Sequence, residues 1–257
     1  MQKVTATVIT LNEEANIEAA LQSLAWVNEI IVVDSGSTDA TVAIARRHGA
    51  RVETRAWEGY SAQKNHAASL ASSDWILSID ADERVPADLS AEIRELLARG
   101  PERSGYRIPR VTWYLGRWIR GTDWYPDYQL RLYDRRAGEW NGRRVHESVA
   151  VREAPGQLHH DLQHYAYRDL SHHLATIDRY TSLAAEQWQT EGRRVSFAGL
   201  LFHPAGAFLR NYLLRRGFTQ GTPGLIVSIL NSYYVFLKFA KLYELARSSH
   251  PAASAAV

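Results

Sequence analysis

Residues 75–84 have the sequence Trp75-Ile76-Leu77-Ser78-Ile79-Asp80-Ala81-Asp82-Glu83-Arg84, a mostly apolar run that leads into an acidic cluster. A short apolar run of this length is typical of a buried strand. In open α/β sheets, ligands bind just outside the carboxyl ends of the strands. Two carboxylates there, Asp80 and Asp82, suit a hard divalent cation that also binds phosphate oxygens. The alternative is an acidic turn that only precedes a helix beginning at Pro86.

Strand and helix patterns alternate on both sides of this stretch. Apolar and β-branched runs predict strands over residues 4–11, 29–34 and 51–55, and helical patterns separate these strands. This alternation predicts an α/β protein with a parallel central sheet. After Gly100 the pattern changes to isolated strands, an aromatic loop over residues 113–128 and a segment rich in histidine.

Acidic clusters follow three of the predicted strands, at residues 12–14, 34–39 and 80–83. Three clusters on one rim of a sheet would repel one another unless each has a partner. A nucleoside diphosphate with a divalent cation would supply such partners, although Ser, Thr and Asp residues also cap helices. The sequence has no G-x-G-x-x-G, P-loop or G-x-S-x-G motif, which argues against a dinucleotide site, a P-loop NTPase and an α/β-hydrolase.

Composition limits the chemistry further. The chain of 257 residues has no cysteine, which excludes disulfides, a thiol nucleophile and cysteine-ligated zinc. Its N-terminus lacks the charged start and apolar run of a signal peptide. The formal net charge of +2 conceals an asymmetry, because the part from Gly192 onward carries eight basic residues and one acid. Such asymmetry suggests a membrane or nucleic-acid surface.

The basic C-terminal part is also apolar and aromatic. Residues 218–237 carry no charge, and this run has the length of a membrane-spanning helix. Pro223 and Asn231 interrupt this run, so an interfacial or buried helix fits better. The flanking Arg215 and Arg216 would suit anionic lipid headgroups. The alternative is a helical subdomain packed on the core with its basic face in water.

The three acidic motifs together resemble the inverting family-two glycosyltransferases with a GT-A fold. The motifs are Thr10-Leu11-Asn12-Glu13-Glu14, Ile31-Val32-Val33-Asp34-Ser35-Gly36-Ser37-Thr38-Asp39 and Asp80-Ala81-Asp82. Residues 59–65, 124–132 and 144–147 are similar to the lipopolysaccharide core glucosyltransferases of bacteria. The resemblance implies an α/β GT-A fold, with a Rossmann-like nucleotide-binding, mostly parallel central sheet and a C-terminal helical, membrane-associating appendage.

This resemblance also implies a division of the chain. We expect a catalytic domain over residues 1–167, with a nucleotide-sugar half at 1–100 and an acceptor half at 101–167. A helical region would follow at 168–247, and a disordered tail at 248–257.

Roles for individual residues follow from the same resemblance. Glu13 and Asp34 would hold the nucleoside, Asp80 the ribose, and Lys64 and Arg131 would neutralise diphosphate. The whole nucleotide-sugar site would comprise Thr10, Asn12, Glu13, Asp34, Gly36, Lys64, Asp80, Ala81 and Arg131. The metal, Mg²⁺ or Mn²⁺, would be bound by Asp82, with His164 as a further contact.

The catalytic base is left open by the sequence. The family uses an acid of a Glu-Asp pair, but this chain has His146-Glu147 at that place. Glu147 is the first candidate, His146 the second and Asp127 the third. A cluster of aromatic residues could stack on sugar rings or simply pack in the core: Trp113, Trp118, Trp124 and Tyr125.

The implied reaction is metal-dependent inverting transfer of a sugar, glucose by resemblance, from a UDP-sugar donor to a glycan or lipid-linked acceptor such as the lipopolysaccharide inner core. We expect a cytoplasmic protein, peripheral on the inner membrane face. The alternatives are a sugar-nucleotide nucleotidyltransferase of similar fold and a non-catalytic, membrane-docked module that binds nucleotide sugars. The acidic rim and the lack of a recognised motif disfavour nucleic-acid binding.

Overall fold

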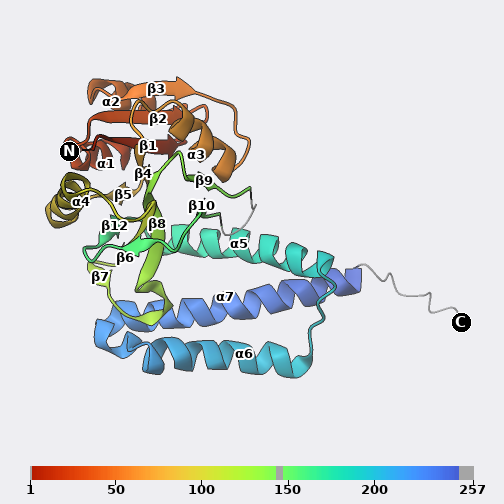
Figure 1. The fold of residues 1–257 in the computed structure, drawn as a ribbon. Helices are drawn as coiled ribbons and strands as arrows, with labels where there is room; N and C mark the ends of the chain where they lie inside the picture. The colour runs from red at the N-terminus through yellow and green to blue at the C-terminus, as the bar shows by residue number, and fades with distance from the viewer. Residues whose placement is uncertain (1, 143–146, 249–257) are drawn as a thin grey trace, which may run out of the picture. The chain divides into compact units, whose positions relative to one another are not determined.

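The computed structural model describes residues 2–142 and 147–248. The second candidate base, His146, and residues 249–257 of the predicted tail therefore lie outside the described residues. The chain divides into two compact units (Figure 1). Unit 1 comprises Met1–Val111 and Pro126–Tyr165, and unit 2 comprises Thr112–Tyr125 and Ala166–Val257.

Unit 1 begins with a parallel half-sheet in the order β3-β2-β1-β4. Its strands are β1 (Val4–Thr10), β2 (Glu29–Asp34), β3 (Arg51–Thr54) and β4 (Trp75–Asp80). Helices α1 (Ile17–Ser23), α2 (Thr41–Arg47) and α3 (Tyr60–Ser69) connect them. Because the strands are parallel, their carboxyl ends meet at one edge, where Thr10, Asp34 and Asp80 are the last residues of β1, β2 and β4.

The sheet continues beyond β4 in the order β4-β8-β6-β12-β5, and its β4–β8, β8–β6 and β12–β5 pairs are antiparallel. These strands are β8 (Asp127–Asp134), β6 (Gly105–Tyr114), β12 (Leu162–His164) and β5 (Glu83–Arg84). Two short strands, β7 (Arg117–Ile119) and β11 (Gly156–Gln157), pair with β6, while β9 (Gly138–Trp140) and β10 (Val149–Val151) form a separate hairpin. The predicted α/β class with a GT-A sheet and a helical appendage is confirmed.

Apolar side chains cover both faces of this sheet. Leu21 of α1 and Leu89 of α4 (Ala87–Arg99) pack in one buried cluster with alternate residues of β1 and β4. Ala67 of α3 and Trp140 of β9 pack in the other cluster, against the opposite face. The central strands are therefore buried on both sides, which explains their nearly continuous apolar sequence.

The described part of unit 2 contains three long helices, α5 (Leu170–Thr190), α6 (Phe197–Leu209) and α7 (Gly221–Ser248). The Asp169 and Ser196 side chains cap α5 and α6 by accepting backbone N–H groups. After α6 the chain continues through a π-helical turn, Arg210–Leu214, and a short 3₁₀ turn, Gly217–Gln220, and α7 returns between α5 and α6 (Figure 1). Within the described part of the chain, one helical stretch, Gly217–Ser248, is long and apolar enough to cross a membrane.

Candidate functional site

The first two acidic motifs form loops that hold each other at the carboxyl edge of the parallel strands. Asn12 has a left-handed backbone (φ 53°), and its Oδ1 accepts the N–H of Thr38 at 2.8 Å. The Asn12 N–H donates to Ser37 Oγ, and the Glu13 N–H donates to Thr41 Oγ1, both at 2.8 Å. The structure therefore brings the predicted residues Asn12 and Glu13 next to the loop that follows Asp34.

The Asp34 carboxylate organises its own turn. One oxygen, Oδ2, accepts the N–H groups of Gly36 and Ser37, both at 2.9 Å, and Oδ1 accepts the Ser37 hydroxyl at 2.5 Å. Gly36 has φ +99°, a conformation that L side chains rarely adopt, so the turn needs glycine there. Asp34 is almost fully buried, and these bonds fix both of its oxygens at the rim.

Two buried polar atoms beside these loops have no hydrogen-bond partner within residues 2–142 and 147–248: Thr10 Oγ1 and Gln63 Oε1. The Gln63 amide nitrogen donates to Ser35 Oγ and to the Arg55 carbonyl, both at 3.1 Å, which orients the amide. An unpaired buried polar atom costs about 1–3 kcal/mol, so a ligand that supplies the missing partner would recover that free energy. Gln63 belongs to the motif at residues 59–65, but its role was not predicted, because its contact with Ser35 is what places it at the rim.

The Asp80 carboxylate lies between two buried cations. Lys64 Nζ is 2.9 Å from Oδ1, and an Arg131 guanidinium nitrogen is 2.5 Å from Oδ2. Both cationic side chains are almost fully buried. Burial alone would raise the pKa of Asp80, but the charges of Arg131 and Lys64 outweigh it and hold that pKa far below its ordinary value. Three predicted residues thus form one charged cluster.

Two further residues complete the cluster. Glu83 is fully buried, and its Oε1 lies 2.6 Å from Arg131 and 3.0 Å from Arg110. Arg110 also donates to Asp127, with nitrogen–oxygen distances of 2.6 and 2.9 Å. No role for Glu83 or Arg110 was predicted, because the place of Arg110 depends on the antiparallel register that sets it opposite Asp127.

The two predicted metal ligands lie side by side. His164 Nε2 is 3.3 Å from Asp82 Oδ2, and the Tyr165 N–H donates to the Asp82 carbonyl at 2.9 Å. Burial raises the pKa of Asp82. The hydrogen bond and the charge of His164 lower that pKa by a larger amount, so it lies below its ordinary value. The β5–β12 pair, which sets His164 opposite Glu83, fixes this geometry.

This pair fits part of a divalent-cation site. Two ligand atoms, each about 2.1 Å from an octahedral ion, lie about 3 Å apart when adjacent, close to the distance between Asp82 and His164. Among the described residues, no group of three or more His, Asp or Glu side chains is arranged to hold a metal by itself. The remaining ligands would be water and the phosphate oxygens of a bound nucleotide.

The candidate bases have different surroundings. Asp127 is tied to Arg110, and its other oxygen accepts the Gln129 amide at 2.7 Å. Glu147 is half-buried and adjoins Ser148, which is bonded to Asn141 at the end of the β9–β10 hairpin. An ion pair with Arg110 therefore connects Asp127 to the Asp80 cluster. Glu147 precedes β10, whose partner strand β9 places the Trp140 ring centroid 4.3 Å from Lys64 Nζ.

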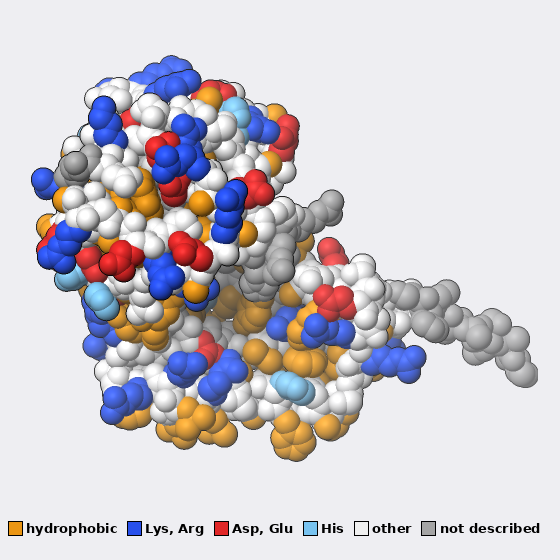
Figure 2. All heavy atoms as spheres, in the orientation of Figure 1, with side chains coloured by type: hydrophobic (Ala, Val, Ile, Leu, Met, Phe, Trp, Pro, Cys, Tyr) orange, Lys and Arg blue, Asp and Glu red, His pale blue; other side chains and the backbone are white. Residues whose placement is uncertain are grey.

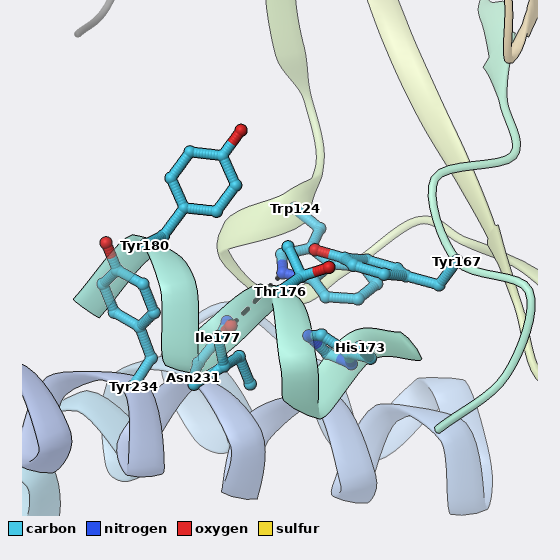
Figure 3. Close-up of a pocket in the computed structure, with 8 residues that line it drawn as sticks. All are labelled: Trp124, Tyr167, His173, Thr176, Ile177, Tyr180, Asn231 and Tyr234. Carbon is cyan, nitrogen blue, oxygen red and sulfur yellow. Dashed lines mark hydrogen bonds between the residues drawn. The ribbon is translucent and has the colours of Figure 1, made fainter. Parts of the chain in front are cut away.

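The residues of the predicted aromatic cluster have three different surroundings in unit 2. Trp113 and Trp118 pack edge to face, with ring centroids 5.0 Å apart, where β6 pairs with β7. Trp124 lines a cavity with residues of α5 and α7 (Figure 3). The Arg120 guanidinium lies over the Tyr125 ring, with its Cζ 5.4 Å from the ring centroid.

Known proteins are similar to this chain, two of them over most of its length. The model of glycosyl transferase family 2 matches residues 5–154. The lipopolysaccharide core biosynthesis glycosyltransferase LpsC of Rhizobium meliloti is 32% identical, over 94% of this chain and 92% of that protein. An uncharacterized glycosyltransferase of Rickettsia typhi is 31% identical, over 97% of this chain and 89% of that protein. Glucosyl-3-phosphoglycerate synthase of Mycobacterium tuberculosis, solved with Mn²⁺ and UDP, is 28% identical, covers 45% of each chain and has a TM-score of 0.37.

Proposed function

The chain belongs to glycosyl transferase family 2, and we propose that it transfers a sugar, with inversion, from a UDP-sugar to a glycan acceptor. One observation carries the proposal. The two interlocked loops lie at the carboxyl edge of the sheet. Asp80 ends β4 at the same edge and pairs with the buried cations Lys64 and Arg131, and the Asp82–His164 pair follows it. Membership of the family identifies the chain as a glycosyltransferase, which leaves the nucleotidyltransferase and the non-catalytic alternatives without support.

The nucleoside would bind against the first two motif loops. Gln63 Oε1 would accept an N–H of the base and Thr10 Oγ1 would bond to a polar group of the donor, which supplies the partners that these buried atoms lack. Glu13 and Asp34 would orient the nucleoside from the same loops. UDP-glucose is the donor that we propose to test first.

The diphosphate would bind beside Lys64 and Arg131. Both cations are held by Asp80 before any donor arrives, so they need little reorganisation to stabilise negative charge on the departing UDP. Asp82 and His164 would hold Mg²⁺ or Mn²⁺, and a bound divalent cation supplies further positive charge against the diphosphate oxygens.

An acceptor-side carboxylate would take the proton from the attacking hydroxyl. Asp127 is our first choice. It pairs with Arg110, Arg110 pairs with Glu83, and Glu83 pairs with Arg131, so this series of ion pairs fixes the position of Asp127 relative to Asp80. Glu147 is the alternative. Asp127→Asn should lower kcat at least 100-fold with donor binding retained, and Glu147→Gln less than tenfold. The reverse pattern would assign the role to Glu147.

We further propose that the acceptor is a lipid-linked glycan such as the lipopolysaccharide inner core, reached at the cytoplasmic membrane face. Similarity to LpsC over nearly its whole length supports the glycan. Hydrophobic side chains of α6 and the turns that follow it support the membrane, and Figure 2 shows such side chains along the lower edge, over α6. Between 51% and 82% of each of these side chains is exposed: Phe197, Leu201, Phe202, Leu209, Leu213, Leu214 and Phe218.

The exposed large hydrophobic residues of α6 form one stripe. At about 100° per residue, Phe197, Leu201 and Leu209 fall on one side of the helix, while the buried Gly199 and Ala207 fall on the other. An unpartnered apolar stripe of this kind is suited to the headgroup–acyl boundary of a bilayer.

The charges beside this stripe agree with an anionic lipid surface. Residues 192–243 contain no Asp or Glu. Arg210 and Arg215 follow the stripe with half-exposed side chains, and both pair with Asp123. The middle helix α7 contacts both α5 and α6, and Ser232 donates to the Pro204 carbonyl of α6 at 2.7 Å. We therefore propose that unit 2 lies on the membrane through α6, and that α7 does not cross it.

Thermal unfolding with a panel of UDP-sugars, each with and without Mn²⁺, tests the donor and metal together. Ligand at 100 times its Kd stabilises the folded state by about 2.7 kcal/mol, which is several degrees in Tm. We expect UDP-glucose to raise Tm only when Mn²⁺ is present. Asp82→Asn should lose this shift. Equal shifts with and without Mn²⁺, in both proteins, would contradict the metal assignment.

A further inference from the structure

Unit 2 contains a cavity of about 270 Å³ that the proposed donor chemistry does not use. It lies among the turn at Trp124, the segment before α5, and helices α5 and α7 (Figure 3). The residues that line it are Trp124, Tyr167, His173, Thr176, Ile177, Tyr180, Asn231 and Tyr234. A volume of this size is small for a binding pocket and suits a single ring better than a larger ligand.

Stacked rings form one wall of the cavity. Trp124 and Tyr167 stack with centroids 5.5 Å apart and planes 29° apart, and Tyr167 lies 4.0 Å from the His173 ring. Trp124 Nε1 donates to Asn231 Oδ1 at 3.2 Å, which holds the indole in place (Figure 3). A rigid aromatic wall of this kind suits the C–H face of a sugar ring.

Hydroxyl groups lie on the other side of the cavity. Figure 3 shows Tyr180 of α5 and Tyr234 of α7 side by side, across from Trp124 and Tyr167. Each phenol can donate and accept a hydrogen bond. Thr176 Oγ1 donates to the His172 carbonyl at 2.9 Å and keeps its acceptor lone pairs. Apolar faces and polar edges are thus both available to a ligand.

The lining carries no net charge near neutral pH. It contains no Lys, Arg, Asp or Glu. Burial, with a smaller effect from His172, lowers the pKa of His173 to about 4, so its ring is neutral, and its Nδ1 lies 2.8 Å from the Tyr114 hydroxyl. Such a site offers nothing to compensate a phosphate, a carboxylate or a cation, and therefore selects an uncharged ligand.

We propose that this cavity is a carbohydrate subsite that holds one uncharged pyranose ring of the glycan acceptor. The proposal rests on the proposed function for the role of that glycan as acceptor, but binding of the ring requires no nucleotide sugar. The rival occupant is an alkyl chain of a lipid, which the aromatic wall would also accept.

Saturation-transfer NMR with octyl β-D-glucoside below its micelle concentration separates these occupants, because one probe carries both a pyranose ring and an alkyl chain. Tyr180→Ala removes one wall, and Tyr233→Ala is the matched control, since Tyr180 and Tyr233 are 41% and 42% exposed and only Tyr180 lines the cavity. We expect ring-proton saturation to fall about threefold to tenfold in Tyr180→Ala and to persist in Tyr233→Ala. Equal ring signals in all three proteins would overturn the proposal, as would loss of alkyl signals alone.

A kinetic measurement then distinguishes failure of this subsite from failure of the proposed function. With UDP-glucose and a glycan released from lipopolysaccharide, Tyr180→Ala should raise the KM for the glycan about threefold to tenfold and leave the KM for UDP-glucose unchanged. An unchanged KM for the glycan in an active enzyme would refute the subsite alone. Absence of UDP release in the unaltered enzyme would instead refute the proposed function.

Discussion

Lys64→Met tests whether the buried cations serve the reaction or only the fold. At 2.9 Å and an effective dielectric constant of about 20, the Coulomb attraction between Lys64 and Asp80 is about 6 kcal/mol. Desolvation of a buried ammonium costs several kcal/mol and offsets most of that attraction. Asp80 also keeps Arg131 as a partner. We therefore expect the variant to fold, with the free energy of unfolding lower by about 1–3 kcal/mol, less than the roughly 3–5 kcal/mol seen when a buried charge loses its partner.

Its activity should fall much further. Removing one preorganised positive charge beside the departing diphosphate should lower kcat about 100-fold to 1000-fold. The assay is UDP release from UDP-glucose in the presence of a glycan acceptor, with urea denaturation as the measure of stability. Lys241→Met is the matched control, because Lys241 pairs with Asp178 at 2.7 Å in unit 2. A folded Lys64→Met enzyme that kept a third of the turnover would refute the reasoning.

Three further predictions follow from other parts of the molecule. His164→Gln should weaken Mn²⁺-dependent UDP binding about tenfold or more, measured by calorimetry, because it removes one of two proposed metal ligands; unchanged affinity would exclude His164. Phe202→Ser on α6 should lower binding to anionic vesicles about threefold to tenfold, whereas Leu183→Ser on α5, also exposed, should not; equal losses would exclude the α6 surface. The pKa of His173 is lowered from 6.5 to about 4, so its contribution to stability is present above pH 6.5 and is lost as pH falls toward 4; the loss at pH 5 is about 2 kcal/mol. His173→Gln should remove this part of the pH dependence in urea denaturation, and an unaltered pH dependence would refute the assignment.

The parallel half of the fold could be predicted because its strands are buried on both faces. The predicted strands at residues 4–11, 29–34 and 75–79 differ from β1, β2 and β4 by no more than one residue at each end. Burial on both faces requires a continuous apolar run, and the acidic residues that follow mark where each strand leaves the core. The same logic placed Asp34 and Asp80 at one edge.

The antiparallel half could not be predicted in the same way. Strands β5 and β12 have two and three residues, and they pair across a separation of about 80 residues, so neither gives a periodic signal. Their pairing is what places His164 opposite Glu83. The partners of Glu83 and Arg110 likewise depend on long-range strand pairing and emerged only from the three-dimensional structure.

The helical unit was predicted in outline. The uncharged run at residues 218–237 predicts an interfacial or buried helix, and α7 extends from Gly221 to Ser248. Pro223 belongs to the first turn of α7, where its missing N–H has no intrahelical partner to lose. At Gly224 an added Cβ would lie 2.1 Å from the Gly217 carbonyl, so the tight return of the chain depends on this glycine. Such a close approach cannot be read from composition.

The anomeric configuration of the product tests the central claim most directly. The enzyme is incubated with UDP-α-glucose, Mn²⁺ and a glycan released from lipopolysaccharide, and the transferred sugar is examined by NMR. Inverting transfer through one carboxylate base predicts a β-linked glucose and one UDP released per sugar transferred. An α-linked product, or UDP release without any glucose on the glycan, would contradict the account.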